Sequence, residues 1–180
     1  LLEWLQSPIV YMENKDFLRE ITALLPAYYS PRNCLHHYLH MAQGNIREYL
    51  SGDRVWVKKY FYVLRPLLAC LWIEAGHGVV PMEFRKLVDG VTLHDELRQA
   101  IERILTDKLA GTEMDDGPRV PVFHAFFDQE IPRLEGVVES IPLGPQPDNE
   151  LLDGTFRRLI GWTRDYPQQK WSLDGLRRGD

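Results

Sequence analysis

Residues 58–74 read KKYFYVLRPLLACLWIE, and this stretch decides the fold. Apolar side chains fill nearly the whole circumference of a helix drawn through it at about 100° per residue. The one polar face carries Lys58, Tyr62, Arg65 and Ala69, with Lys59 at its border. A helix that is apolar almost all round lies inside a bundle. We therefore predict an all-α, multi-helix bundle around a central buried helix over about residues 58–75, with at most a short extended segment near the N-terminus.

The cations of this helix are costly to bury without anionic partners. Either acidic side chains of neighbouring helices pair with them, or they line a cleft that takes an anion, and the sequence leaves both open. Pro66 predicts a bend, because it has no N–H to donate to the carbonyl of Tyr62 and its ring crowds that carbonyl. The bend and the freed carbonyl fall on the side of the basic residues.

Helical spacing and turn signals predict further helices on either side of the central one. We expect them over residues 16–25, 31–50, 92–110 and 118–138, with a short one from Pro81 and a last one capped by Asp148 or Asn149. Pro26 should stop the first of these, and Thr92 should cap the helix that runs to about residue 110. Ile9 to Tyr11 is the expected extended run. The helical domain then covers residues 1–164, and residues 165–180 form a loosely held tail.

The 31–50 helix has the clearest start, because Ser30 offers a capping hydroxyl and Pro31 suits the first helical position. We expect the short segment 51–53 to lead directly into the central helix, which makes an antiparallel helical hairpin. The hairpin brings the preceding helix against the polar face of the central one.

The composition restricts the function classes. The chain has 180 residues and a formal net charge of −5, which argues against a protein coated in basic charge for bulk nucleic-acid binding but leaves room for a local basic cleft. Cys34 and Cys70 fall inside predicted helices, and we expect reduced core thiols in a cytoplasmic protein. No signal peptide and no apolar run of membrane length occurs, so we expect no membrane partner.

Several segments together resemble a known family. They are LLEWLQSPIVY at residues 1–11, HYLHMAQGNIREYL at 37–50, and VKKYFYVLRPLLACLWIEAG at 57–76 followed by PMEF at 81–84. The combination resembles the predicted nucleotidyltransferase family of the DNA polymerase beta superfamily that is linked to RNA ligase and RNA repair. The resemblance covers roughly residues 1–109. In that family a catalytic core with a Gly-Ser motif and metal-binding aspartates precedes the helical part.

This chain has no Gly-Ser motif and no Asp-x-Asp pair, and it opens at Leu1 without an initiator methionine. The resemblance therefore implies the helical C-terminal part of a nucleotidyltransferase, beginning just after the catalytic core. Mg²⁺ and a nucleoside triphosphate are expected for the intact enzyme. For this chain alone we expect no cofactor, no catalytic residue and no metal ligand, so it should not transfer a nucleotide by itself.

The best candidate substrate-binding residues are Lys58, Lys59, Tyr62 and Arg65. Lysine and arginine would neutralise phosphates, and tyrosine would stack on a base or bind a sugar. Across the hairpin, His37 and Asn45 are expected to face this group. The expected partners are a nucleotide and RNA. The competing interpretations are structural ion pairs for the cations and a satisfied polar patch for the helix that bears His37.

Two other function classes stay open. Arg32 and His37 fit a short ribonuclease motif in which arginine holds the phosphate and histidine performs acid–base cleavage. His36 and His40, four residues apart, suit a metal, but no third ligand is evident. A non-enzymatic interaction module, or a homodimer, would bury the large apolar side chains of Phe123, Phe126, Phe127, Trp162 and Trp171.

Overall fold

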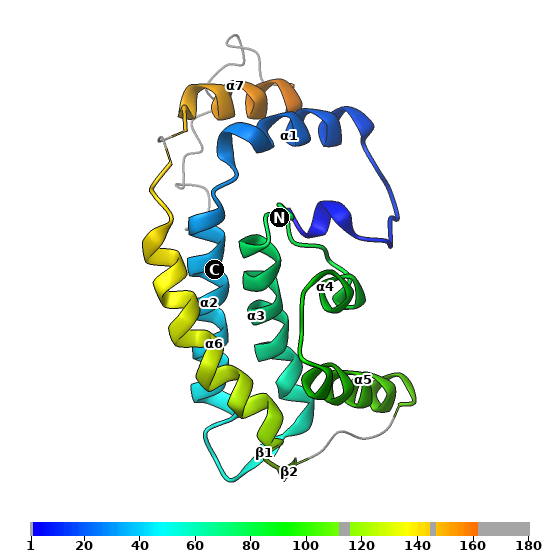
Figure 1. Cartoon of the computed structure of the whole chain (residues 1–180). Coiled ribbons are helices and arrows are strands. Elements are labelled where there is room, and N and C mark those ends of the chain that lie inside the picture. Colours follow the sequence, from blue (N-terminus) through cyan, green and yellow to red (C-terminus); the bar gives the residue numbers. More distant parts are fainter. Residues whose placement is uncertain (1, 112–115, 145–146, 162–180) are drawn as a thin grey trace, which may run out of the picture. The chain divides into compact units, whose positions relative to one another are not determined.

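A computed structural model describes residues 2–111, 116–144 and 147–161 (Figure 1). The described parts of residues 1–13 and 28–145 form one compact unit, and those of 14–27 and 146–180 form another. In chain order the first unit contains η1 (Trp4–Gln6), α2 (Pro31–Tyr49), β1 (Arg54–Trp56), η2 (Val57–Lys59), α3 (Tyr60–Glu74), α4 (Phe84–Gly90), α5 (Asp95–Leu109), β2 (Asp116–Pro118) and α6 (Pro121–Ser140). Most of α1 (Lys15–Tyr28) and the helix α7 (Asn149–Leu159) belong to the second unit.

Helix α3 is the centre of the first unit, as the sequence predicts. Leu64, Leu67 and Leu68 are completely buried on it. Helices α2, α4 and α6 pack against α3, with α2 the most extensive neighbour (Figure 1). Ala69, which the helical wheel places on the polar face, is also buried, so that face is narrower than expected. The all-α class is confirmed.

The antiparallel hairpin of α2 and α3 forms as predicted, but its connection is different. Ser30 caps α2, and its hydroxyl accepts from the backbone N–H of Asn33 at 3.3 Å. The chain then does not run straight into α3, because β1 and η2 intervene. Strand β1 pairs antiparallel with β2, with Val55 opposite Gly117. The expectation of no strand beyond the first few residues was wrong. The sequence did not reveal β1 and β2 because each is only three residues long and too short for an alternating pattern.

Other element boundaries differ from the predicted ones by a few residues. Pro26 does not stop α1, which includes it and ends at Tyr28. A proline this close to a helix end removes one hydrogen bond without stopping the last turn. Helix α5 is preceded by His94 rather than capped by Thr92. Residues 9–11 form no strand and are exposed. The predicted tail, residues 165–180, lies outside the described residues.

The second unit is held by a cap and an ion pair. Asn14 accepts at 3.0 Å from the backbone N–H groups of Asp16 and Phe17 at the start of α1. The Arg158 guanidinium lies 3.0 Å from a carboxylate oxygen of Glu20 and joins α7 to α1. Asp148 caps α7, as one of the two predicted alternatives.

Both cysteines are free thiols in the first unit. Cys34 is half-buried and Cys70 is buried, and burial raises the pKa of Cys70 to about 12. A thiol with so high a pKa is an inert core residue at neutral pH. In the part of the chain that the structure describes, no helix is both long enough and apolar enough to cross a bilayer.

A buried hydrogen-bond chain joins α3 to α6. The hydroxyl of Tyr60 accepts from the backbone N–H of Val120 at 2.8 Å and lies 3.1 Å from Nε2 of His124. Because the hydroxyl oxygen already accepts from Val120, its own proton is available to an unprotonated Nε2. Burial, and next the charge of Arg119, lower the pKa of His124. The neutral ring is therefore the form that fits this site.

We expect the free energy of unfolding to decrease as the pH falls below about 6.5, the ordinary pKa of histidine. Below that pH the unfolded chain binds a proton at His124 that the folded chain resists, so folding becomes less favourable. Urea unfolding at several pH values between neutral and mildly acidic would measure the change. His124→Gln keeps an acceptor for Tyr60 and should weaken the dependence, whereas the exposed His94→Gln should retain it. An unchanged dependence in His124→Gln would exclude this cause.

Candidate functional site

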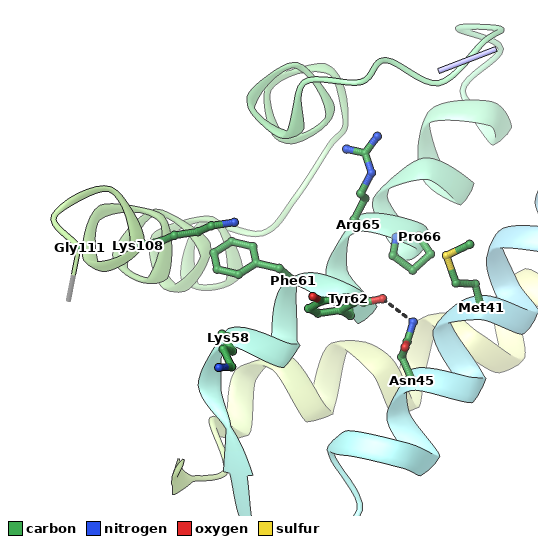
Figure 2. Close-up of a pocket in the computed structure, with 9 residues that line it drawn as sticks. All are labelled: Met41, Asn45, Lys58, Phe61, Tyr62, Arg65, Pro66, Lys108 and Gly111. Carbon is green, nitrogen blue, oxygen red and sulfur yellow. Dashed lines mark hydrogen bonds between the residues drawn. The ribbon is translucent and has the colours of Figure 1, made fainter. Parts of the chain in front are cut away.

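A pocket of about 550 Å³ lies between α2, the start of α3 and the end of α5 (Figure 2). Its lining residues are Met41, Asn45, Lys58, Phe61, Tyr62, Arg65, Pro66, Lys108 and Gly111. Four of the predicted binding residues are among them: Asn45, Lys58, Tyr62 and Arg65. None of the nine described lining residues is acidic, and three carry a positive charge.

Pro66 of α3 lines one wall of this pocket. Pro66 leaves the carbonyl of Tyr62 without its helical donor, and the side-chain amide of Asn45 donates to that carbonyl at 2.9 Å (Figure 2). The bond satisfies a backbone group that would otherwise be costly to leave unpaired. Asn45 therefore faces α3 across the hairpin, as predicted, and ties α2 to the turn of α3 that precedes Pro66.

Arg65 forms a structural ion pair, which is one of the two alternatives that the sequence leaves open for the cations of the central helix. Its guanidinium lies 2.6 Å from a carboxylate oxygen of Glu3 and donates to the backbone carbonyls of Pro81 and Met82 at 3.0 Å. The hydroxyl of Tyr38 donates to the other oxygen of Glu3. Burial, and next the bond to Glu3, raise the pKa of Tyr38, which keeps the phenol protonated. Arg65 thus lines the pocket with its charge already compensated.

Lys58 and Lys108 differ from Arg65, because no ion pair joins either one to a carboxylate of the described residues. The Nζ atom of Lys58 lies 4.5 Å from the ring centroid of Trp56, and that of Lys108 lies 4.6 Å from the ring of Phe61. Both lysines are exposed. A cation held by an aromatic face keeps most of its charge available to an anion. Among the described residues, these two lysines supply the positive charge of the pocket that no carboxylate pairs with.

Two predicted binding residues lie outside the pocket lining. Lys59 is held by two tyrosines, with its Nζ 3.8 Å from the ring of Tyr49 and 4.6 Å from that of Tyr62. His37 is exposed on α2, edge-on to the ring of Tyr38 at 5.5 Å between centroids.

Sequence reasoning missed Lys108 as a site residue. It lies in the last turn of α5, distant in sequence from the hairpin, and no spacing within α5 distinguishes it from other surface lysines. Only the packing of α5 beside η2 brings it to the pocket. Phe61, which the helical wheel assigns to the buried circumference, is half-buried and faces Lys108 (Figure 2).

A second pocket of about 510 Å³ lies between the start of α5 and α6. Its cation, Arg133, is clamped by two carboxylates. The guanidinium contacts Glu74 at 2.5 Å and 2.7 Å, and its Nε donates to Glu130 at 2.8 Å. Because two acids surround one base, this pocket is less suited to an anion than the first.

Comparison with known proteins identifies the family. Residues 1–158 match the family RlaP, described as the RNA repair pathway DNA polymerase beta family. The chain belongs to this family. It is 41% identical over 134 residues to the uncharacterized protein YcgL of Bacillus subtilis (strain 168). The aligned residues make up 74% of this chain and 52% of YcgL. The chain thus spans about half the length of this curated relative. No solved structure matches it significantly.

The RlaP match confirms the family resemblance inferred from the central segments. By its description, the RlaP family places this chain among nucleotidyltransferase-like proteins of RNA repair. In the described ranges no group of three histidine, cysteine, aspartate or glutamate residues is arranged to hold a metal ion. The rings of His36 and His40 lie 4.3 Å apart without such a third ligand.

The structure also places most of the residues on which the two alternative functions of this RlaP chain depend, a ribonuclease and an interaction module. The Arg32 guanidinium donates to the carbonyl of Ile141 at 2.8 Å, and His37 lies about 140° further round α2. Phe123 and Phe127 are buried in the core, and Phe126 packs against it, so these three side chains do not form an exposed patch. Trp162 and Trp171 lie outside the described residues. Both alternative functions stay predictions.

Proposed function

We propose that these helices form the substrate-binding part of a nucleotidyltransferase, and that the pocket of Lys58 and Lys108 binds the phosphates of a nucleotide. The observation that carries the proposal is the presence of two lysines without a described carboxylate partner in a pocket whose described lining residues include no acid. This local charge contrasts with the formal net charge of −5 of the whole chain. Phosphate oxygens accept strong charge-assisted hydrogen bonds from ammonium groups.

The other lining residues suit the rest of a nucleotide. Tyr62 exposes about half of its surface, and Phe61 is half-buried, so aromatic faces are available to a base or a sugar. Asn45 spends one amide hydrogen on the carbonyl of Tyr62 and keeps its oxygen as an acceptor. These features support a nucleotide over a bare inorganic anion.

The intact protein is proposed to transfer a nucleotide to RNA or to another acceptor, using Mg²⁺ and a nucleoside triphosphate. Mg²⁺ needs oxygen ligands, carboxylates above all, and the described residues provide no such group. No catalytic step is therefore assigned to them; their role is to bind and orient. The free thiols Cys34 and Cys70 support a cytoplasmic setting.

The double variant Lys58→Gln with Lys108→Gln should bind ATP about 100-fold more weakly than the unmodified chain, or weaker still. Each lysine is expected to contribute about 1.5 kcal/mol or more through charged hydrogen bonds, and 1.4 kcal/mol is about tenfold in affinity. Equilibrium dialysis with ATP would measure the change. Binding should also weaken as salt rises, because both lysines are exposed and screened.

Lys86→Gln is the matched control. Lys86 is an exposed lysine of α4 that pairs with Glu83 at 2.6 Å and does not line the pocket. Its substitution should leave the ATP affinity unchanged. Equal affinities for all three proteins, or no ATP binding by any of them, would overturn the proposal.

A further inference from the structure

An exposed tryptophan lies beside the phosphate pocket, at the end of β1. Trp56 exposes 51% of its surface, and Lys58 extends from the next turn to within 4.5 Å of its ring. Tyr62 exposes 53% and is approached by Lys59. Two half-exposed aromatic rings, each with a lysine ammonium beside it, are thus carried by consecutive segments of the chain.

Strand pairing holds Trp56 outward. Side chains alternate along a strand, and Val55 is the buried residue of β1, whereas Arg54 and Trp56 are exposed. Because Trp56 is paired with Asp116 of β2, its ring cannot turn into the core without loss of the strand register. The pairing thus leaves about half of the Trp56 surface open to a ligand.

The charges around Trp56 favour an anionic partner. Asp116, which pairs with Trp56 across the strands, is occupied by an ion pair with Arg54. The guanidinium of Arg119 donates to the carbonyls of Ser51 and Gly52 at the same end of the unit. No ion pair joins Lys58 or Lys59 to a carboxylate among the residues that the structure describes, so neither ammonium group is paired there.

Lys58 connects this surface to the pocket, because the same side chain contacts Trp56 and lines the pocket. Tyr62 also lines the pocket and contacts Lys59. A chain of phosphates that leaves the pocket along Lys58 would pass over Trp56. Exposed aromatic rings beside cations are the combination found on surfaces that bind single strands, where bases stack on the rings and lysines neutralise the backbone.

We propose that Trp56 is a stacking platform for a base of single-stranded RNA, and that Lys58 guides the RNA backbone from this platform into the pocket. The inference rests on the proposed phosphate site, which it extends from a nucleotide to an RNA strand. A duplex hides its base faces in the helical stack, so the platform discriminates against double-stranded RNA.

The test is fluorescence anisotropy with a labelled single-stranded oligoadenylate of about ten nucleotides, within the site sizes of single-strand binding domains. Trp56→Ala should weaken binding about 5- to 100-fold, the range expected for one lost base stack. Trp56→Phe keeps a ring and should bind nearly as well as the unmodified chain. Trp4→Ala is the control, since Trp4 is a still more exposed tryptophan (70%) on η1 and its loss should leave binding unchanged.

ATP separates this inference from the proposed function. The lysine double variant should weaken the binding of both ATP and the oligonucleotide. Trp56→Ala should weaken the binding of the oligonucleotide much more than that of ATP, because its ring contacts Lys58 but would stack only on a base of the strand. If none of the variants bound ATP more weakly than the unmodified chain, that result would count against the phosphate pocket and not against the Trp56 platform. Equal oligonucleotide affinity in Trp56→Ala and the unmodified chain, no binding of the oligonucleotide at all, or equal affinity for duplex RNA would each overturn the platform.

Discussion

Replacing Leu64 by alanine should lower the free energy of unfolding by about 2–5 kcal/mol. Leu64 is completely buried in the middle of α3, where the loss of its side chain removes apolar contacts and leaves a cavity. Such a loss is a large part of the stability of a domain of this size. Urea unfolding followed by circular dichroism would measure it.

Leu109→Ala is the matched control for this prediction. Leu109 ends α5 and exposes 81% of its surface, so the same chemical change should cost less than about 0.5 kcal/mol. Similar small losses for both variants would show that α3 is not the buried centre of the bundle.

Arg65→Ala should lower the free energy of unfolding by about 2–3 kcal/mol. The change leaves the Glu3 carboxylate with Tyr38 alone and removes the donor for the carbonyls of Pro81 and Met82. Breaking a fully buried pair costs about 3–5 kcal/mol, and the smaller figure applies because solvent reaches part of this one. Chemical denaturation would measure the loss.

Arg103→Ala, at an exposed arginine of α5, is the control and should change stability by less than about 0.5 kcal/mol. Arg65→Lys should recover part of the loss, because an ammonium keeps the charge but not the planar set of donors. Unaltered stability of Arg65→Ala, together with weaker ATP binding, would instead make Arg65 a phosphate ligand rather than a structural cation.

The sequence predicted the centre of the fold because its signal is local. An apolar run with one narrow polar face has no stable place except inside a bundle, and Ser30-Pro31 marks the start of α2 through the same cap that the structure contains. The two short strands escaped prediction for the opposite reason. Their pairing joins residues more than 50 positions apart, as between Val55 and Gly117, and neither strand has a pattern of its own.

The sequence predicted those site residues that lie close together in the chain, around the start of α3. Lys58 of η2 lines one pocket with Tyr62 and Arg65 of α3. Pro66 leaves the carbonyl of Tyr62 without its helical donor, which explains why Asn45 of α2 is needed beside Tyr62. A helical wheel cannot show which of the cations forms an ion pair with a carboxylate. Glu3 reaches Arg65 from the beginning of the chain, and Lys108 reaches the pocket from α5. Both depend on packing between distant segments, which no spacing within one helix encodes.

The most direct test of the central claim is an NMR titration of the isotope-labelled chain with ATP. The side-chain amide of Asn45 and the backbone amides of Tyr62 and Lys108 should shift together and saturate with one binding constant, because they line one pocket. The shifts should vanish in the Lys58→Gln, Lys108→Gln double variant. Absence of shifts at these positions, or shifts confined to the second pocket around Arg133, would contradict the proposal that the pocket between α2, α3 and α5 binds nucleotide phosphates.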